Sequence, residues 1–371
     1  MSDIRLNKLA KLLVNYSTKI KKGDFVFVSC EDVASPFMTE IVKEATIAGA
    51  HVETILTSQS VSEAKIKNSS DSQLMEENYI FKYALEKADV WISAWGTRNT
   101  KYMSNIDSTK IKNSMIGQKS WRKVYSSKMG NGSLRWVGTQ YPTYADAQEA
   151  SMSLSEYEDF VYSAGLLDKE NPVDLWNEIS LNQEKWVKYL DSKKELHIIS
   201  KDTDIKVETE GRKWINCDGR VNFPDGEIFT SPINSGINGY ISFSFPGIYA
   251  GKEIEDIKLV VEKGKVIKAT AKKGEDLLLE LLKTDDGSSY FGEVAIGTNY
   301  GIDRFTKNML FDEKIGGTIH MAIGDSMPEA GGINKSVIHW DMLCDMKNEG
   351  KIYADGELFY EKGKFIDNVL I

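Results

Sequence analysis

The chain has 371 residues, of which 41% are hydrophobic and 27% charged, a composition typical of globular proteins in water. This length exceeds the roughly 250–300 residues that one hydrophobic core supports, so it favours two domains. The net charge of −9 argues against nucleic-acid binding, which needs a basic surface, and clustered carboxylates could attract cations instead.

The three cysteines, Cys30, Cys217 and Cys344, lie far apart and share no CxxC spacing. This pattern argues against a disulfide framework or a zinc knuckle and fits a reducing compartment. The residues MSDIRLNKLA lack the apolar core of a signal peptide, and no apolar run approaches the ~18 residues of a membrane span. We therefore expect a cytoplasmic protein that binds neither membranes nor nucleic acids.

The first half of the chain alternates helical and strand patterns. Apolar residues at helical spacing predict a helix within residues 5–20, and a second helix follows with Ser35 as N-cap, Pro36 just inside and Gly49 near its end. Short apolar runs predict buried strands at residues 25–30, 51–56 and 88–95. This alternation predicts a parallel sheet with helices on its faces, without the glycine-rich loop of a dinucleotide site.

The pattern changes after a long polar helical stretch. Ser153 followed by Glu156 predicts a capping box, and helical spacing continues to about residue 195. From His197 onward, short strands alternate with turns rich in Gly, Asp and Asn. We therefore predict an α/β N-terminal domain with a mostly parallel sheet at residues 1–192 and a β-rich α+β C-terminal metal domain at residues 193–371. We interpret His51 and His197, in strand-like runs, as structural histidines.

Two glutamates in the second domain stand out from their local patterns. A Pro-Asp-Gly turn places Glu227 at the start of a strand-like EIFT segment, where it would by itself be an exposed turn residue. Glu293 interrupts an apolar run, and an unpaired buried carboxylate is costly. A salt bridge and a metal ion account for Glu293 equally well.

Further acids and histidines follow in the same domain. Asp312 and Glu313 precede a turn, and His320 lies in an apolar strand-like run. His339 and Asp341 are two residues apart, so a strand would turn them to one face; the simplest alternative is an Asp that only orients a core histidine. Together these residues suit Zn, Co or Mn, and five or six ligands suit two metal ions that share a carboxylate and a water.

The chain resembles the aminopeptidase T / aminopeptidase S family of bacterial metallo-aminopeptidases, of the thermophilic metalloprotease type. The resemblance rests on four segments in this order: NFPDGEIFTSP, GEVAIGTNYG, LFDEKIGGTIHMAIGDSMPEAGG and SVIHWDM. It extends upstream to SMSLSEYEDFVYSAGL and KKGDFVFV, and so covers most of the chain. The resemblance implies a homodimeric exopeptidase that uses two divalent metal ions to remove single residues from peptides with a free N-terminus.

Carried over by motif, the resemblance also implies a set of metal ligands: Glu227, Glu293, Glu313, His320, His339 and Asp341. Either Glu227 or Glu313 would be the general base that accepts a proton from water. The family commonly has a tyrosine before the proline that follows the histidine motif, and here that position is Met327, before Pro328. A thioether cannot replace a phenol as a hydrogen-bond donor or hard ligand.

Two other functions are open to such a chain. One is a dinuclear amidase or esterase that acts on substrates other than peptides. The other is a metal-binding homologue with reduced activity, in which Met327 marks the lost chemistry.

Overall fold

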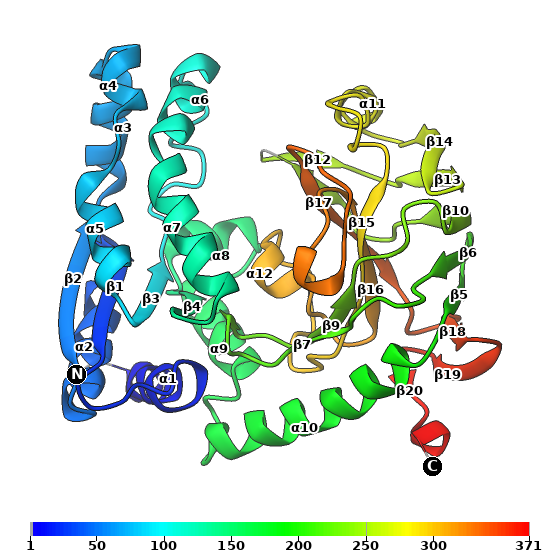
Figure 1. The fold of residues 1–371 in the computed structure, drawn as a ribbon, viewed down its shortest axis with the longest axis horizontal. Helices are drawn as coiled ribbons and strands as arrows, with labels where there is room; N and C mark the ends of the chain where they lie inside the picture. The colour runs from blue at the N-terminus through cyan, green and yellow to red at the C-terminus, as the bar shows by residue number, and fades with distance from the viewer. Residues whose placement is uncertain (1–2, 250, 371) are drawn as a thin grey trace. The chain divides into compact units, whose positions relative to one another are not determined.

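The computed structural model describes residues 3–249 and 251–370, and these form two compact units (Figure 1). The first unit contains residues 1–173 and 219–224, and the second contains residues 174–218 and 225–371. The predicted division into independent domains at Ser192 stays a prediction. No helix within the described ranges is long and apolar enough to cross a membrane.

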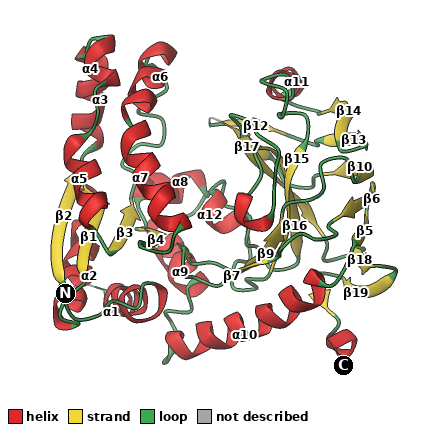
Figure 2. Cartoon of the chain, in the orientation of Figure 1, coloured by secondary structure: helices red, strands yellow, loops and turns green. Residues whose placement is uncertain are grey.

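The first unit is built on a parallel sheet of five strands in the order β2-β1-β3-β4-β8. The strands are β1 (Phe25–Glu31), β2 (His51–Thr57), β3 (Val90–Trp95), β4 (Arg135–Gln140) and β8 (Asn222–Phe223). Its helices are α1 (Ile4–Leu12), α2 (Ser35–Ile47), α3 (Gln59–Asn68), α4 (Asp71–Met75), α5 (Tyr79–Lys87), α6 (Ser108–Gly117), α7 (Lys119–Gly130), α8 (Tyr144–Glu149) and α9 (Leu154–Ala164) (Figure 2). The predicted α/β class of this half is confirmed.

Aromatic residues pack one face of this sheet. Phe27, Trp91 and Trp136 lie side by side in the strand register, and Phe81 of α5 and Trp121 of α7 pack against them. Residues 26–30 of β1 are all buried, so both faces of the sheet are covered at this central strand, as is typical of parallel sheets.

The start of α2 differs from the prediction. Ser35 is the first residue of the helix and its side chain makes no cap hydrogen bond; the capping position belongs to Ala34. The reason is a short 3-10 turn at Asp32–Ala34, which leads directly into the helix and occupies the place of an extended N-cap residue.

The predicted capping box of α9 is confirmed. Oγ of Ser153 accepts from the N–H of Glu156 at 3.3 Å, and the Glu156 carboxylate accepts from the N–H of Ser153 at 2.8 Å. We expect Ser153→Ala to lower the free energy of unfolding by about 1 kcal/mol, because one helix N–H loses its partner. Urea unfolding measures this. Ser35→Ala, which removes a serine without a cap bond, is the control and should change stability much less.

The second unit begins within α10 (Pro172–Asp191) and contains two large antiparallel sheets and a third of only two strands. The eight-stranded sheet consists, in spatial order, of β14 (Lys265–Thr270), β13 (Lys258–Glu262), β10 (Ile237–Ser242), β6 (Thr203–Glu208), β5 (Glu195–Ser200), β18 (Lys351–Ala354), β19 (Glu357–Glu361) and β20 (Lys364–Phe365). The five-stranded sheet consists of β17 (His339–Asp345), β16 (Thr318–Gly324), β15 (Phe291–Gly297), β9 (Glu227–Thr230) and β7 (Ile215–Cys217). The smaller elements are β11 (Gly247–Tyr249), β12 (Lys252–Ile254), α11 (Glu275–Leu281) and α12 (Met309–Asp312).

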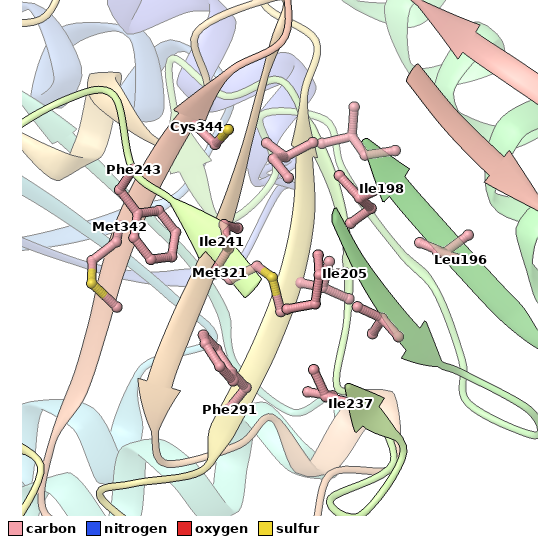
Figure 3. Close-up of a cluster of buried hydrophobic side chains, with 14 of the residues drawn as sticks. Leu196, Ile198, Ile205, Ile237, Ile241, Phe243, Phe291, Met321, Met342 and Cys344 are labelled. Atoms are coloured by element: carbon pink, nitrogen blue, oxygen red, sulfur yellow. The ribbon is translucent and has the colours of Figure 1, made fainter. Parts of the chain in front are cut away.

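The main hydrophobic core of this unit draws side chains from both sheets. Ile198, Ile205 and Ile241 come from the eight-stranded sheet, and Met321 and Met342 come from the five-stranded sheet (Figure 3). Because strand side chains alternate, each sheet has a second face that does not enter this core. The predicted β-rich class of the second half is confirmed.

Candidate metal centre

The five-stranded sheet has one face in the core and an opposite face that carries ionisable residues. The core residues of β16 and β17 are Ile319, Met321, Ile323, Trp340, Met342 and Cys344. His320 alternates with the first three, and His339 and Asp341 alternate with the last three, so all three project from the opposite face, here called the ligand face. The predicted common direction of His339 and Asp341 agrees with a distance of 3.5 Å between Nε2 and Oδ1.

A β-bulge brings Glu293 onto the ligand face. The pairing register between β15 and β16 shifts between Phe291 and Glu293. Phe291 and Val294 both enter the core although three positions separate them, which regular alternation forbids and a bulge permits. Glu293 therefore lies opposite the core, with Oε1 at 3.3 Å from Nε2 of His320.

Glu227 comes to the same face from the start of β9. It follows Gly226, which has a φ of 124°. A Cβ atom at position 226 would lie only 2.7 Å from Cβ of Asn299, so only glycine fits there. The interpretation of Glu227 as an exposed turn residue is wrong. Its exposed fraction is 5%, because β9 lies inside the sheet between β15 and β7.

Glu293 links two groups of three possible ligands. Its Oε1 faces His320, and its Oε2 lies 3.5 Å from Nε2 of His339. Oε2 of Glu227 lies 3.5 Å from Nε2 of His320 and completes the first group, and Asp341 completes the second. Within each group, one donor atom of every residue lies within 4.8 Å of the others. This arrangement suits two cations that share one carboxylate.

The donor atoms fit divalent cations. Oε2 of Glu227 and Oδ1 of Asp341 are buried and have no hydrogen-bond partner within residues 3–249 and 251–370. Buried carboxylate oxygens without partners are costly, and metal coordination would satisfy them. Ala322, which pairs with both Glu293 and Asp341 in the sheet register, has a small side chain that leaves space between them. Imidazole with carboxylate oxygen suits Zn, Co or Mn.

The backbone orients the ring of His339. Its Nδ1 lies 2.8 Å from the carbonyl oxygen of Asp325, so an Nδ1–H donates there and Nε2 points to the ligand face. The N–H of Asp325 donates in turn to the carbonyl of Ile338 at 2.7 Å, which ties this segment to the residue before the histidine. Histidine ligands of metals are commonly held in this way.

The carboxylates make both histidines basic. Burial disfavours the charged form of His320, but its hydrogen bond to Glu293 and the nearby negative charges raise its pKa to about 9. Burial likewise opposes the charge of His339, and Asp341 and Glu293 outweigh it and raise its pKa to about 10. Burial raises the pKa of Glu227 to about 8, against the opposing charge of Lys314. The surroundings therefore favour the protonated forms of both histidines and of Glu227.

Lys314 is a residue of this site that no pattern in the sequence indicated. Its side chain is fully buried, and its Nζ contacts the carboxylate of Glu313 and lies 3.8 Å from Oε1 of Glu227. Burial works against the ammonium, but Glu227, Glu313 and Asp225 hold the pKa of Lys314 well above its ordinary value. A lysine directly after two acids looks in the sequence like part of a charged surface, so no local signal marks it.

The other residues considered in the sequence lie outside the two ligand groups. Glu313, the sixth predicted ligand, lies in neither group and pairs with Lys314. Met327 packs against an apolar cluster of Phe229, Ala295 and Ala330. His51 opens β2 in the first unit, and His197 pairs with Asp204 at 2.8 Å, so neither histidine joins the ligand groups.

Two histidines, one buried and one partly exposed, with three carboxylates on one sheet face define a candidate metalloenzyme. Residues 2–365 match the family model described as "Thermophilic metalloprotease (M29)", and the chain belongs to this family. The family resemblance predicted from the sequence is thereby confirmed.

Curated relatives match along nearly their whole length. Aminopeptidase AmpS of Bacillus subtilis is 28% identical, with 95% of this chain and 96% of that protein covered. Aminopeptidase T of Thermus thermophilus is 24% identical, with 95% of each covered.

Two solved structures share the fold. Wild-type AmpT from Thermus thermophilus matches with a TM-score of 0.86 at 21% identity, covering 98% of this chain and 99% of that one. A 2,5-dihydroxypyridine dioxygenase from Pseudomonas putida matches with a TM-score of 0.61 at 14% identity, covering 99% and 98%. A fold shared by an aminopeptidase and a dioxygenase does not define the chemistry, which depends on the residues of the site.

Proposed function

We propose that this metalloprotease is an aminopeptidase that binds two divalent metal ions on the ligand face. Glu227 and His320 would hold one ion, His339 and Asp341 the other, and Glu293 both. The observation that carries the proposal is the division of the Glu293 carboxylate, whose two oxygens face different histidines. Zn, Co and Mn are the metals that this ligand set favours.

The ions would supply Lewis acidity that polarises a peptide carbonyl and acidifies water. The chain's own residues must then accept and return a proton. Glu313 suits this role better than Glu227, because Glu313 lies outside both ligand groups and its side chain is partly exposed, whereas Glu227 belongs to one group. Lys314 contacts the Glu313 carboxylate and would hold it in place for this proton transfer.

We expect cleavage to require a free substrate amine. Three carboxylates on the ligand face favour a cationic α-amine, and the relatives carry the name aminopeptidase. N-acetylation of an amino-acid p-nitroanilide should abolish its hydrolysis, and longer peptides should shorten one residue at a time from the N-terminus. Release of p-nitroaniline and mass spectrometry of the peptides measure the two effects.

The same substrates separate the alternative functions. Efficient hydrolysis of acetylated amides or simple esters, with little hydrolysis of free-amine peptides, would indicate an amidase or esterase. Metal binding without turnover of any substrate would indicate a homologue with reduced activity. The apolar packing of Met327 fits a role in the wall of a substrate pocket, where a phenol is not needed. A cytoplasmic homodimer stays a prediction of the family resemblance.

Metal binding should depend steeply on pH. The pKa values of about 9 and about 10 mean that His320 and His339 are protonated near neutral pH in the metal-free protein, and metal ions need the neutral rings. Affinity should therefore rise with pH, by about tenfold per pH unit for each proton displaced. Competition with a chromophoric chelator from pH 6.5 to pH 8.5 measures this slope, and a flat profile would contradict the ligand assignment.

A further inference from the structure

Lys314 is the one buried lysine in the described part of the second unit, and it lies among three carboxylates. Its Nζ contacts Glu313 and lies 3.8 Å from Oε1 of Glu227 and 3.9 Å from Oδ1 of Asp225. Burying an ammonium group is costly unless partners compensate its charge. A neutral side chain of the same length would avoid that cost, so the position of this charge requires a reason beyond filling space.

The two oxygens of Glu227 have different surroundings. Oε1 faces the ammonium of Lys314, whereas Oε2 faces His320 at 3.5 Å and has no hydrogen-bond partner within the described ranges. The positive charge of Lys314 therefore attracts Oε1 away from the metal centre, and Oε2 is the oxygen that can bind a metal ion. A carboxylate held in this way offers one donor atom instead of two.

A third possible cation group adjoins the two of the proposed metal centre. Cys217, Asp225 and Glu227 each place a donor atom within 4.8 Å of the others. Lys314 Nζ lies within 3.9 Å of carboxylate oxygens from two of these three residues. A divalent cation so close to an ammonium would be strongly repelled.

The backbone around Lys314 is held on both sides. Its N–H donates to the carbonyl of Phe311 and its carbonyl accepts from the N–H of Asn299, each at 3.0 Å. The Asn299 side chain donates to the carbonyl of Asp225 at 2.8 Å. Asn299 thus connects the backbone of Lys314 to the segment that precedes Glu227.

We propose that Lys314 is a positioning residue that acts as a built-in cation. It makes Glu227 present a single oxygen, Oε2, to the metal centre, and it keeps a third metal ion away from Cys217, Asp225 and Glu227. The inference rests on the proposed function, because it takes Glu227 as a ligand. If Lys314 served only to balance the charge of the buried carboxylates, its replacement would change stability but neither the affinity for metal ions nor their number.

The test compares Lys314→Met, Lys314→Arg and the wild type by titration with Co²⁺. The wild type should bind two ions. Lys314→Met should bind the Glu227-dependent ion at least ~10-fold more weakly and take up a further ion, with a thiolate-to-Co²⁺ absorption band as Cys217 loses its proton to solvent. Lys314→Arg keeps the charge and should bind two ions without the band. Lys258→Met removes an exposed lysine that pairs with Asp202 at 2.8 Å, and it is the control.

Lys314→Met removes the ammonium that three carboxylates face, and the variant could fail to fold. In that case Lys314→Met with Asp225→Asn removes one negative charge together with the positive one. Weakened binding of one ion by this folded double variant supports the proposal. Two ions bound with wild-type affinity and no thiolate band in either variant would overturn it. Failure of the wild type itself to bind two ions would instead refute the proposed dinuclear function.

Discussion

Glu293→Gln is expected to remove both metal ions and lower kcat/KM by at least about 1,000-fold. Each carboxylate oxygen faces a different histidine, so one substitution affects both ligand groups. A glutamine amide keeps the shape but offers one weak oxygen and a nitrogen that donates. Loss of several kcal/mol of Lewis-acid stabilisation corresponds to a factor of this size. Elemental analysis after dialysis and peptidase kinetics measure the two effects.

A matched control removes a buried glutamate elsewhere. Glu44 in α2 is also buried and accepts a hydrogen bond from Asn7 at 2.9 Å, but it lies in the first unit and in no ligand group. Glu44→Gln should change stability and leave metal content unaltered. If Glu293→Gln kept two ions at wild-type affinity, the shared carboxylate would not be a ligand.

Strand alternation made part of the site predictable. The pattern around Trp340 indicated that His339 and Asp341 turn to one face, and this depends only on local backbone geometry. The apolar run around Glu293 likewise indicated a buried carboxylate that needs a partner. Features of this kind are contained in a few consecutive residues.

Features that depend on distant segments were not predictable. Glu227 is buried because β7 and β15 flank its strand, and these come from separate parts of the chain. Lys314 has its role through Glu227 and Asp225, nearly ninety residues earlier in the sequence. The bulge at Glu293 appears only in the register with β16. The prediction of Ser35 as the N-cap of α2 was wrong for a local reason. The residues before the helix fit several types of turn, and the sequence did not indicate the 3-10 turn that forms there.

His339→Ala is expected to separate the two ligand groups. The substitution removes one ligand from the group of Glu293 and Asp341 and leaves Glu227 and His320 in place. One ion should therefore remain while the second is lost, and peptidase activity should fall by at least ~100-fold because the activated water and the second Lewis acid are lost together. Metal analysis and kinetics on a free-amine p-nitroanilide measure both.

His51→Ala is the control for this variant, because His51 lies at the exposed start of β2 in the first unit. It should change neither metal content nor activity. Exogenous imidazole offers a further check, since it can enter the space left by the His339 ring and restore part of the metal binding. The carbonyl of Asp325, which accepts from Nδ1 of His339, is a backbone group and is still present in the variant to hold the added imidazole. Wild-type stoichiometry with near-normal activity in His339→Ala would exclude the second ligand group, and loss of both ions would mean that the two sites bind cooperatively through Glu293.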